Sequence, residues 1–150
     1  MISEQNPVRL YVSHTWEPDD DYTRVFEFLE SARNFYYLNM SAPDRRPPGG
    51  REAERDALRQ QMSKAEAVIL LASQYRRATD LLEFQAHCAK ASDKPIILVS
   101  SFGATSEMPK SLLVHANETI DWDERRLVDA IKRQARHEET SRWDSIDFTP

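Results

Sequence analysis

The sequence is poor in cysteine and glycine. Cys88 is the single cysteine of the 150 residues, so an intrachain disulfide and a cysteine-rich zinc site are excluded, and a reducing cytoplasm is the expected location. The three glycines, Gly49, Gly50 and Gly103, form neither G-x-G-x-x-G nor G-x-x-x-x-G-K-[ST]. A glycine-rich phosphate-binding loop of the usual kind is therefore absent.

Long hydrophobic runs and long basic runs are also missing. No stretch approaches the roughly 18 apolar residues of a membrane span, and residues 1–10 have no apolar signal-peptide core. With 20 Lys and Arg against 25 Asp and Glu, the net charge is −5, which is unlike most nucleic-acid binders. The 4 histidines lack metal-ligand spacing. We expect no membrane, no nucleic acid and no metal, which leaves small molecules and proteins as partners.

Hydrophobic residues make up 40% of the chain, which suits one globular domain over residues 1–137 with a tail, 138–150, that docks or frays. β-rich and amphipathic segments alternate along it. The expected strands are residues 8–13, 35–38, 67–72, 95–99 and 119–120. The first expected helix begins at Asp19, Asp20 or Asp21 and buries Tyr22, Val25, Phe26 and Leu29 on one face. The others are 51–64, 80–91, a short turn at 109–113, and a last helix that Asp121 or Asp123 caps. This alternation predicts an α/β fold, a flavodoxin-like, five-stranded, mostly parallel sheet with helices on both faces.

In such a sheet, with strand order 2-1-3-4-5, ligands bind at the carboxyl ends of the first and third strands. The loops that follow these strands are rich in side chains suited to ligand binding, although ordinary loop polarity is the alternative. They are Trp16 and Tyr75 for stacking, Ser13, His14 and Ser73 for hydrogen bonds, and Arg76 and Arg77 for phosphate.

Gln85 stands out in the expected helix 80–91. Leu82, Ala86 and Ala89 form a buried stripe on this helix, and Gln85 belongs at its border. An amide there needs hydrogen-bond partners. It either contacts a ligand or bonds to the carbonyl of a neighbouring loop.

Several segments together resemble a known family. They are Ser13-His14-Thr15-Trp16, the segment 39–43 (Asn-Met-Ser-Ala-Pro), the run 67–72 followed by Tyr75, Asp80 at a helix start, and Lys94-Pro95-Ile96-Ile97. In order and spacing these resemble the TIR-like domains of bacterial antiphage defence, most of all those of Thoeris systems. The resemblance covers about residues 8–133.

The resemblance implies a TIR fold that takes NAD as its substrate and cleaves the bond between nicotinamide and ribose. Such an NAD glycohydrolase or ADP-ribosyl cyclase releases an ADP-ribose-derived immune signal. Carried onto this chain, the family's catalytic glutamate falls on Gln85, and Leu81 stands where many TIR domains have tryptophan. The implied nucleotide pocket is Ser13, His14, Trp16, Asn39, Ser41 and Tyr75, with Arg76 or Arg77 at the pyrophosphate.

Glutamine at the catalytic position predicts an impaired enzyme or a substrate trap. Cleavage builds positive charge on the ribose, which a carboxylate stabilises and an amide does not. Glu83 is two residues away, about 200° around the helix, and is a poor substitute. The sequence leaves open whether Gln85 replaces a native glutamate or marks a natural inactive relative.

The alternative function is a non-catalytic TIR sensor or adaptor. The resemblance implies self-association into a homo-oligomer or filament, a phage protein as a possible trigger, and a downstream effector reached through a diffusible nucleotide signal. Trp143, Ile146 and Phe148 in the tail are candidate contacts. A phosphoacceptor receiver is disfavoured, because Ala72-Ser73 and Ser13-His14 stand where its aspartates belong.

Overall fold

The structure is a computed structural model that describes residues 1–103 and 108–140. It contains a five-stranded sheet in which every neighbouring pair is parallel, in the order β2-β1-β3-β4-β5. The strands are β1 (Val8–Val12), β2 (Tyr37–Asn39), β3 (Ala67–Leu71), β4 (Ile96–Val99) and β5 (Glu118–Ile120). The predicted flavodoxin-like α/β fold and its strand order are confirmed.

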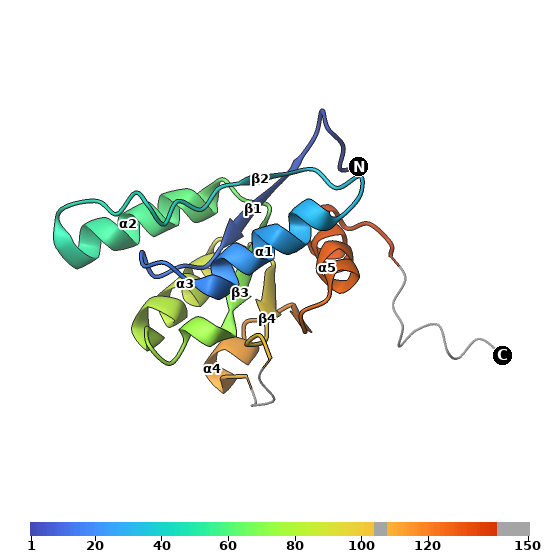
Figure 1. Ribbon diagram of the computed structural model, residues 1–150. Helices are drawn as coiled ribbons and strands as arrows, with labels where there is room; N and C mark the ends of the chain where they lie inside the picture. The colour runs from blue at the N-terminus through green and yellow to red at the C-terminus, as the bar shows by residue number, and fades with distance from the viewer. Residues whose placement is uncertain (104–107, 141–150) are drawn as a thin grey trace.

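Helices cover both faces of this sheet (Figure 1). They are α1 (Asp20–Ser31), α2 (Gly50–Ser63), α3 (Thr79–Ala91), the short α4 (Lys110–Leu113) and α5 (Glu124–Arg136), with one 3₁₀ turn, η1 (Ala72–Gln74), directly after β3. Helices α1 and α5 pack on one face, and α2 and α3 on the other. Within the described part of the chain, no helix has the length and apolarity needed to cross a membrane.

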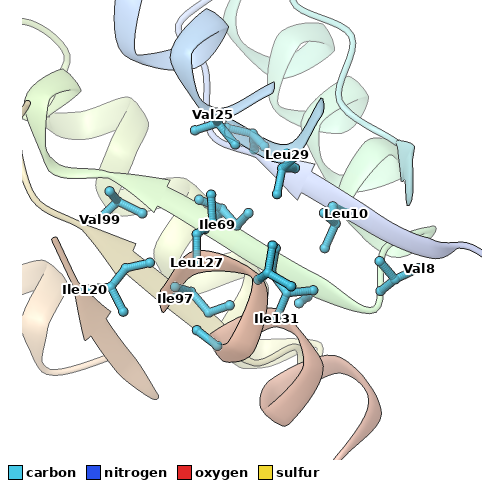
Figure 2. Packing of buried hydrophobic residues seen from close by; sticks show 14 of the residues in the cluster. Val8, Leu10, Val25, Leu29, Ile69, Ile97, Val99, Ile120, Leu127 and Ile131 are labelled. Atoms are coloured by element: carbon cyan, nitrogen blue, oxygen red, sulfur yellow. The ribbon is translucent and has the colours of Figure 1, made fainter. Parts of the chain in front are cut away.

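The continuous apolar run of β3 is explained by burial on both sides. Ile69 faces the helices α1 and α5, where it packs in one cluster with Leu29 and Leu127 (Figure 2). Its neighbours Val68 and Leu70 point the opposite way, into the cluster beneath α2 and α3. Successive side chains of a strand alternate between faces, so a central parallel strand must be apolar throughout.

Most of the predicted strand and helix bounds differ from the structure by one residue at an end. The second strand and the cap of the last helix need separate comment. The second strand was expected at 35–38 but lies at Tyr37–Asn39, because Phe35 packs into the core before the strand begins. The cap of α5 is Asp123, whose side chain accepts a hydrogen bond from the backbone N–H of Arg126 at 2.8 Å. Trp143, Ile146 and Phe148 lie outside the described residues, so a role for the tail stays a prediction.

Candidate functional site

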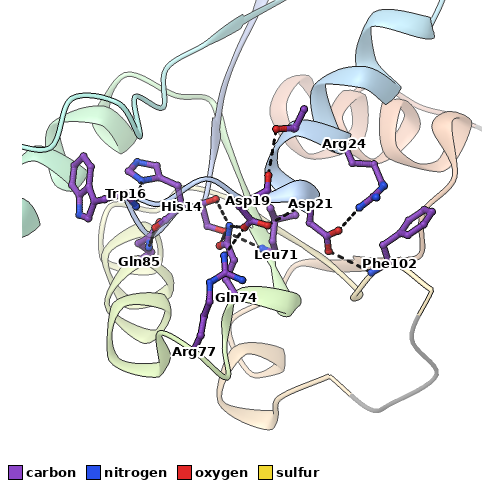
Figure 3. Close-up of polar contacts among 12 residues, drawn as sticks. His14, Trp16, Asp19, Asp21, Arg24, Leu71, Gln74, Arg77, Gln85 and Phe102 are labelled. Atoms are coloured by element: carbon purple, nitrogen blue, oxygen red, sulfur yellow. Dashed lines mark hydrogen bonds and ion pairs between the residues drawn. The ribbon is translucent and has the colours of Figure 1, made fainter.

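The carboxyl ends of β1 and β3 meet in a polar network rather than an open crevice (Figure 3). The residues that follow β1 fold inward: Ser13, His14, Thr15 and Trp16 are all buried. The network joins this loop to three helices through side-chain amides. The question for function is therefore which polar groups remain available to a ligand.

Gln85 lies fully buried at the centre of this network. Its Oε1 accepts hydrogen bonds from the Tyr11 hydroxyl at 2.5 Å and from the His14 backbone N–H at 3.3 Å. Its Nε2 donates to the carbonyl oxygens of His14 at 2.9 Å and Leu81 at 3.2 Å. Both ends of the amide are satisfied, and the bond to the His14 carbonyl is the loop contact considered for a structural glutamine. Position 85 is inside the packed face rather than at its border.

The His14 ring is held as one neutral tautomer. Gln61 Oε1 lies 2.9 Å from His14 Nε2 and also accepts from the Ala42 backbone N–H at 2.9 Å, so it is an acceptor and Nε2 carries the proton. Nδ1 accepts from the Trp16 backbone N–H at 3.3 Å. Burial lowers the pKa of His14 from its ordinary value of 6.5. Protonation of His14 would add a hydrogen to Nδ1. That N–H would then face the Trp16 backbone N–H and could no longer accept its hydrogen bond.

Folding stability should therefore fall in mild acid. Because the folded-state pKa of His14 lies below its unfolded value, stability is full above about pH 6.5 and is lost as the pH falls below it. We expect urea unfolding to show lower stability at pH 5.5 than at pH 7.5, and a smaller difference in the His14→Gln variant. His115→Gln, at a much less buried histidine, should keep most of the wild-type difference. An unchanged difference in His14→Gln would contradict this assignment.

A second part of the network anchors η1 to the loop after β1. The Ser13 hydroxyl donates to Gln74 Oε1 at 2.7 Å and accepts from the Leu71 backbone N–H at 2.9 Å. Gln74 Nε2 donates to the Ser13 carbonyl at 2.9 Å and to the Asp19 carboxylate at 2.5 Å. Asp19 also caps α1 and pairs with Arg77 at 3.0 Å. The sequence identified Asp19 only as a helix cap and missed Gln74 altogether, because no local pattern marks a glutamine that pairs across the sheet.

A third part surrounds the end of β2. Asn39 Nδ2 donates to the Tyr22 hydroxyl at 3.0 Å, and Asn39 Oδ1 accepts from the Ser41 backbone N–H at 2.9 Å and from the Ser41 hydroxyl. The Tyr22 ring stands edge-on to His14, with 6.3 Å between the ring centroids. The structure thus brings together six predicted site residues. They are Ser13, His14, Trp16, Asn39, Ser41 and Gln85.

Tyr75 and Arg76 are separated from that group. They line a different hollow of about 440 Å³, together with Ser101 and Pro109. The Tyr75 hydroxyl donates to Glu83 at 3.0 Å and accepts from the Ser111 hydroxyl at 2.9 Å. The expected convergence of all the loop residues on one crevice is wrong for these two, because η1 turns the chain toward α4 immediately after β3.

Trp16 is not an open stacking platform in this conformation. Its side chain is 8% exposed and lies edge-on to His14, with 4.6 Å between the ring centroids. Its backbone has a φ of +70°, in the left-handed region that is rare for a large side chain. Its indole N–H and the neighbouring Thr15 hydroxyl are buried without a hydrogen-bond partner among the described residues. Strain and unpaired groups of this kind concentrate at functional loops.

A hollow does open at the carboxyl ends beside this network. It has a volume of about 390 Å³, and its lining includes Asp19, Ser73 and Arg77. On its far side, Arg24 lies 3.8 Å above the Phe102 ring, which holds the loop after β4 against α1. Two of these lining residues, Ser73 and Arg77, are candidates that the sequence indicated, whereas Asp19 is an addition from the structure.

The sequence matches no known family model and no curated protein. Within residues 1–103 and 108–140, no three His, Cys, Asp or Glu side chains are grouped as metal ligands. The functional proposal therefore rests on the geometry of the site and on the family resemblance.

Proposed function

We propose that this chain is a TIR-like sensor or adaptor of bacterial antiphage defence, which binds a nucleotide of the NAD class without cleaving it. The observation that carries the proposal is the hydrogen bonding of the buried Gln85 side chain. Its amide makes four hydrogen bonds to Tyr11, His14 and Leu81, and two of them require an N–H donor. This use of the amide supports a role in fixing the loop after β1 rather than in bond cleavage.

The chemistry of glycosidic cleavage supports the same conclusion. Positive charge that develops on the ribose needs a carboxylate beside it. The nearest carboxylate along α3 is Glu83, which is about 200° around the helix from Gln85 and accepts a hydrogen bond from Tyr75. Asp19 is paired with Arg77. Neither group stands in for a carboxylate at position 85.

One observation favours the second candidate, an NAD glycohydrolase or ADP-ribosyl cyclase with its catalytic residue replaced. Gln85 touches both β1 and the loop that follows it, at the end of the sheet where ligands of this fold bind. Under this proposal Gln85 marks the position of the lost carboxylate. The protein would then be a substrate trap.

NAD consumption and NAD binding distinguish the two candidates. We would measure product masses after incubation with NAD, and affinity by calorimetry, for the wild type, Gln85→Glu and the charge-matched control Gln60→Glu on the exposed side of α2. The sensor or adaptor proposal predicts binding without turnover in all three proteins. Turnover in Gln85→Glu alone would establish the trapped enzyme, and absence of NAD or ADP-ribose binding would contradict both.

The remaining properties belong to the same proposal. The single cysteine favours a cytoplasmic location. The family resemblance implies self-association into an oligomer or filament, a phage protein as trigger, and a downstream effector reached through a nucleotide signal. Mass measurements in solution with and without NAD test the self-association.

A further inference from the structure

A second hollow lies between the start of α2 and the start of α3, and its chemistry differs from that of the network. Its volume is about 450 Å³, and three arginines line it, Arg51, Arg55 and Arg77. The chain as a whole carries a net charge of −5. The lining also contains Glu54 and Asp80, so three arginines against two carboxylates give it a small net positive charge, opposite in sign to that of the whole chain.

The arginines of α2 are only weakly compensated. Arg51 and Arg55 are four residues apart, an arrangement of like charges that disfavours the helix. Arg51 is 68% exposed at its side chain, and its nearest carboxylate, Asp80, is 3.9 Å away. Arg55 has no ion pair with any carboxylate in the described part of the chain. An anion in the hollow would relieve this repulsion.

Arg55 is also held in place. Its guanidinium lies over the ring of Phe84 on α3, 4.9 Å from the centroid. Stacking of this kind fixes the plane of the guanidinium and leaves its N–H edge free to bind an oxyanion in a bidentate manner. Ordering before binding reduces the entropy lost when a ligand arrives.

The other groups of the lining suit the rest of a nucleotide. Ala78 precedes α3 and offers no side-chain cap, so the first N–H groups of that helix add to the attraction for an anion. Glu54 also lines the hollow but is already held by Arg46. Asp80 lines it too, and a carboxylate accepts hydrogen bonds from ribose hydroxyls. Leu81 adds an apolar wall. A bare phosphate would use only the arginines, whereas a sugar phosphate uses all of these groups.

We propose that this hollow binds the diphosphate of a nucleotide, with Arg51 and Arg55 on the phosphate oxygens and Arg77 at its edge. The choice of a nucleotide diphosphate rests on the proposed function, and the arginine site itself rests on the geometry. Arg77 also lines the neighbouring hollow beside Asp19. An elongated dinucleotide can therefore extend past Arg77 from one hollow into the other.

Calorimetry with three probes tests the site: ADP-ribose, inorganic pyrophosphate and adenosine. The variant is Arg51→Gln/Arg55→Gln, and the matched control is Arg33→Gln, at an exposed arginine just beyond the end of α1. We expect ADP-ribose and pyrophosphate to bind the wild type and Arg33→Gln alike, and to bind the double variant about tenfold or more weakly. Added salt should weaken both. Melting temperatures check that all three proteins fold.

The outcomes separate this inference from the proposed function. If ADP-ribose binds the double variant as tightly as the wild type, nucleotide binding stands and the arginine site is overturned. If pyrophosphate binding depends on the two arginines while ADP-ribose does not bind here and NAD does not bind in the experiment on the proposed function, the anion site stands and the NAD-class function fails. If pyrophosphate fails to bind the wild type, the site is overturned. Adenosine that binds as tightly as ADP-ribose would overturn the role of the phosphates.

Discussion

Replacing Gln85 with glutamate is expected to lower the melting temperature of the protein by roughly 10 °C at pH 8, corresponding to about 3 kcal/mol. The carboxylate keeps the acceptor role toward Tyr11 and His14. It cannot donate to the carbonyl oxygens of His14 and Leu81, which lie 2.9 Å and 3.2 Å from the present Nε2. A buried negative charge would face two carbonyl oxygens.

The loss of stability in Gln85→Glu should become smaller as the pH falls. Burial and the two carbonyls raise the pKa of a carboxyl at this position, and its protonated form donates one hydrogen bond. The destabilisation should therefore be smaller at pH 5 than at pH 8, when each is compared with wild type at the same pH. Thermal melts of Gln85→Glu measure this, and Gln60→Glu should melt close to wild type at both values. An equally stable Gln85→Glu would show that position 85 accommodates a carboxylate and would favour the enzyme candidate.

Replacing Asp19 with alanine is expected to cost roughly 2–3 kcal/mol of folding stability. The change removes the cap of α1, whose Oδ1 accepts from the Asp21 backbone N–H at 3.0 Å. It also leaves the buried amide of Gln74 without one of its acceptors, and Arg77 without its carboxylate. Helix α1, the turn η1 and Arg77 would therefore all lose a contact with the same carboxylate.

The neighbouring Asp20 provides the matched control. It is exposed and lies in the first turn of α1, where its charge favours the helix by at most about 1 kcal/mol. Urea unfolding of Asp19→Ala and Asp20→Ala should therefore give clearly different losses. Equal losses would mean that Asp19 acts only through the helix dipole, and that its contacts with Gln74 and Arg77 add nothing.

The fold was predictable because its signals are local. A few neighbouring residues are enough to predict a buried segment, as in the apolar run of β3 and the periodic Val25 and Leu29 of α1. The strand order was expected from the flavodoxin-like arrangement, one of the common orders of parallel sheets with helices on both faces. The edge strand β2 was displaced by more than the others, since aromatic residues such as Phe35 occur in a buried core as readily as in a strand.

The candidate site was only partly predictable because its signals are tertiary. The loop after β1 and Gln85 of α3 were identified, but the burial of the loop also depends on amides from α2 and η1 that have no sequence pattern of their own. Gln61, which fixes the tautomer of His14, looked like an ordinary helix residue. The arginines of α2 could not be recognised as a site from the sequence, because only the fold places Phe84 of α3 beneath Arg55 and Arg59.

The placement of β1 between β2 and β3 also bears on how the chain acquires its structure during synthesis. The first strand to leave the ribosome pairs with β2 on one side, but its other edge pairs Leu10 with Ala67 and Val12 with Ile69. That edge of β1 stays unpaired until β3 has emerged. The apolar side chains of β1 that pack in one cluster with α5 stay uncovered by that helix until the last part of the chain has emerged. Closing so long a loop slows folding and leaves a strand edge exposed to other chains. We therefore expect nascent chains that end before Ala67 to bind chaperones. Longer chains, in which β3 has paired with β1, should no longer need them.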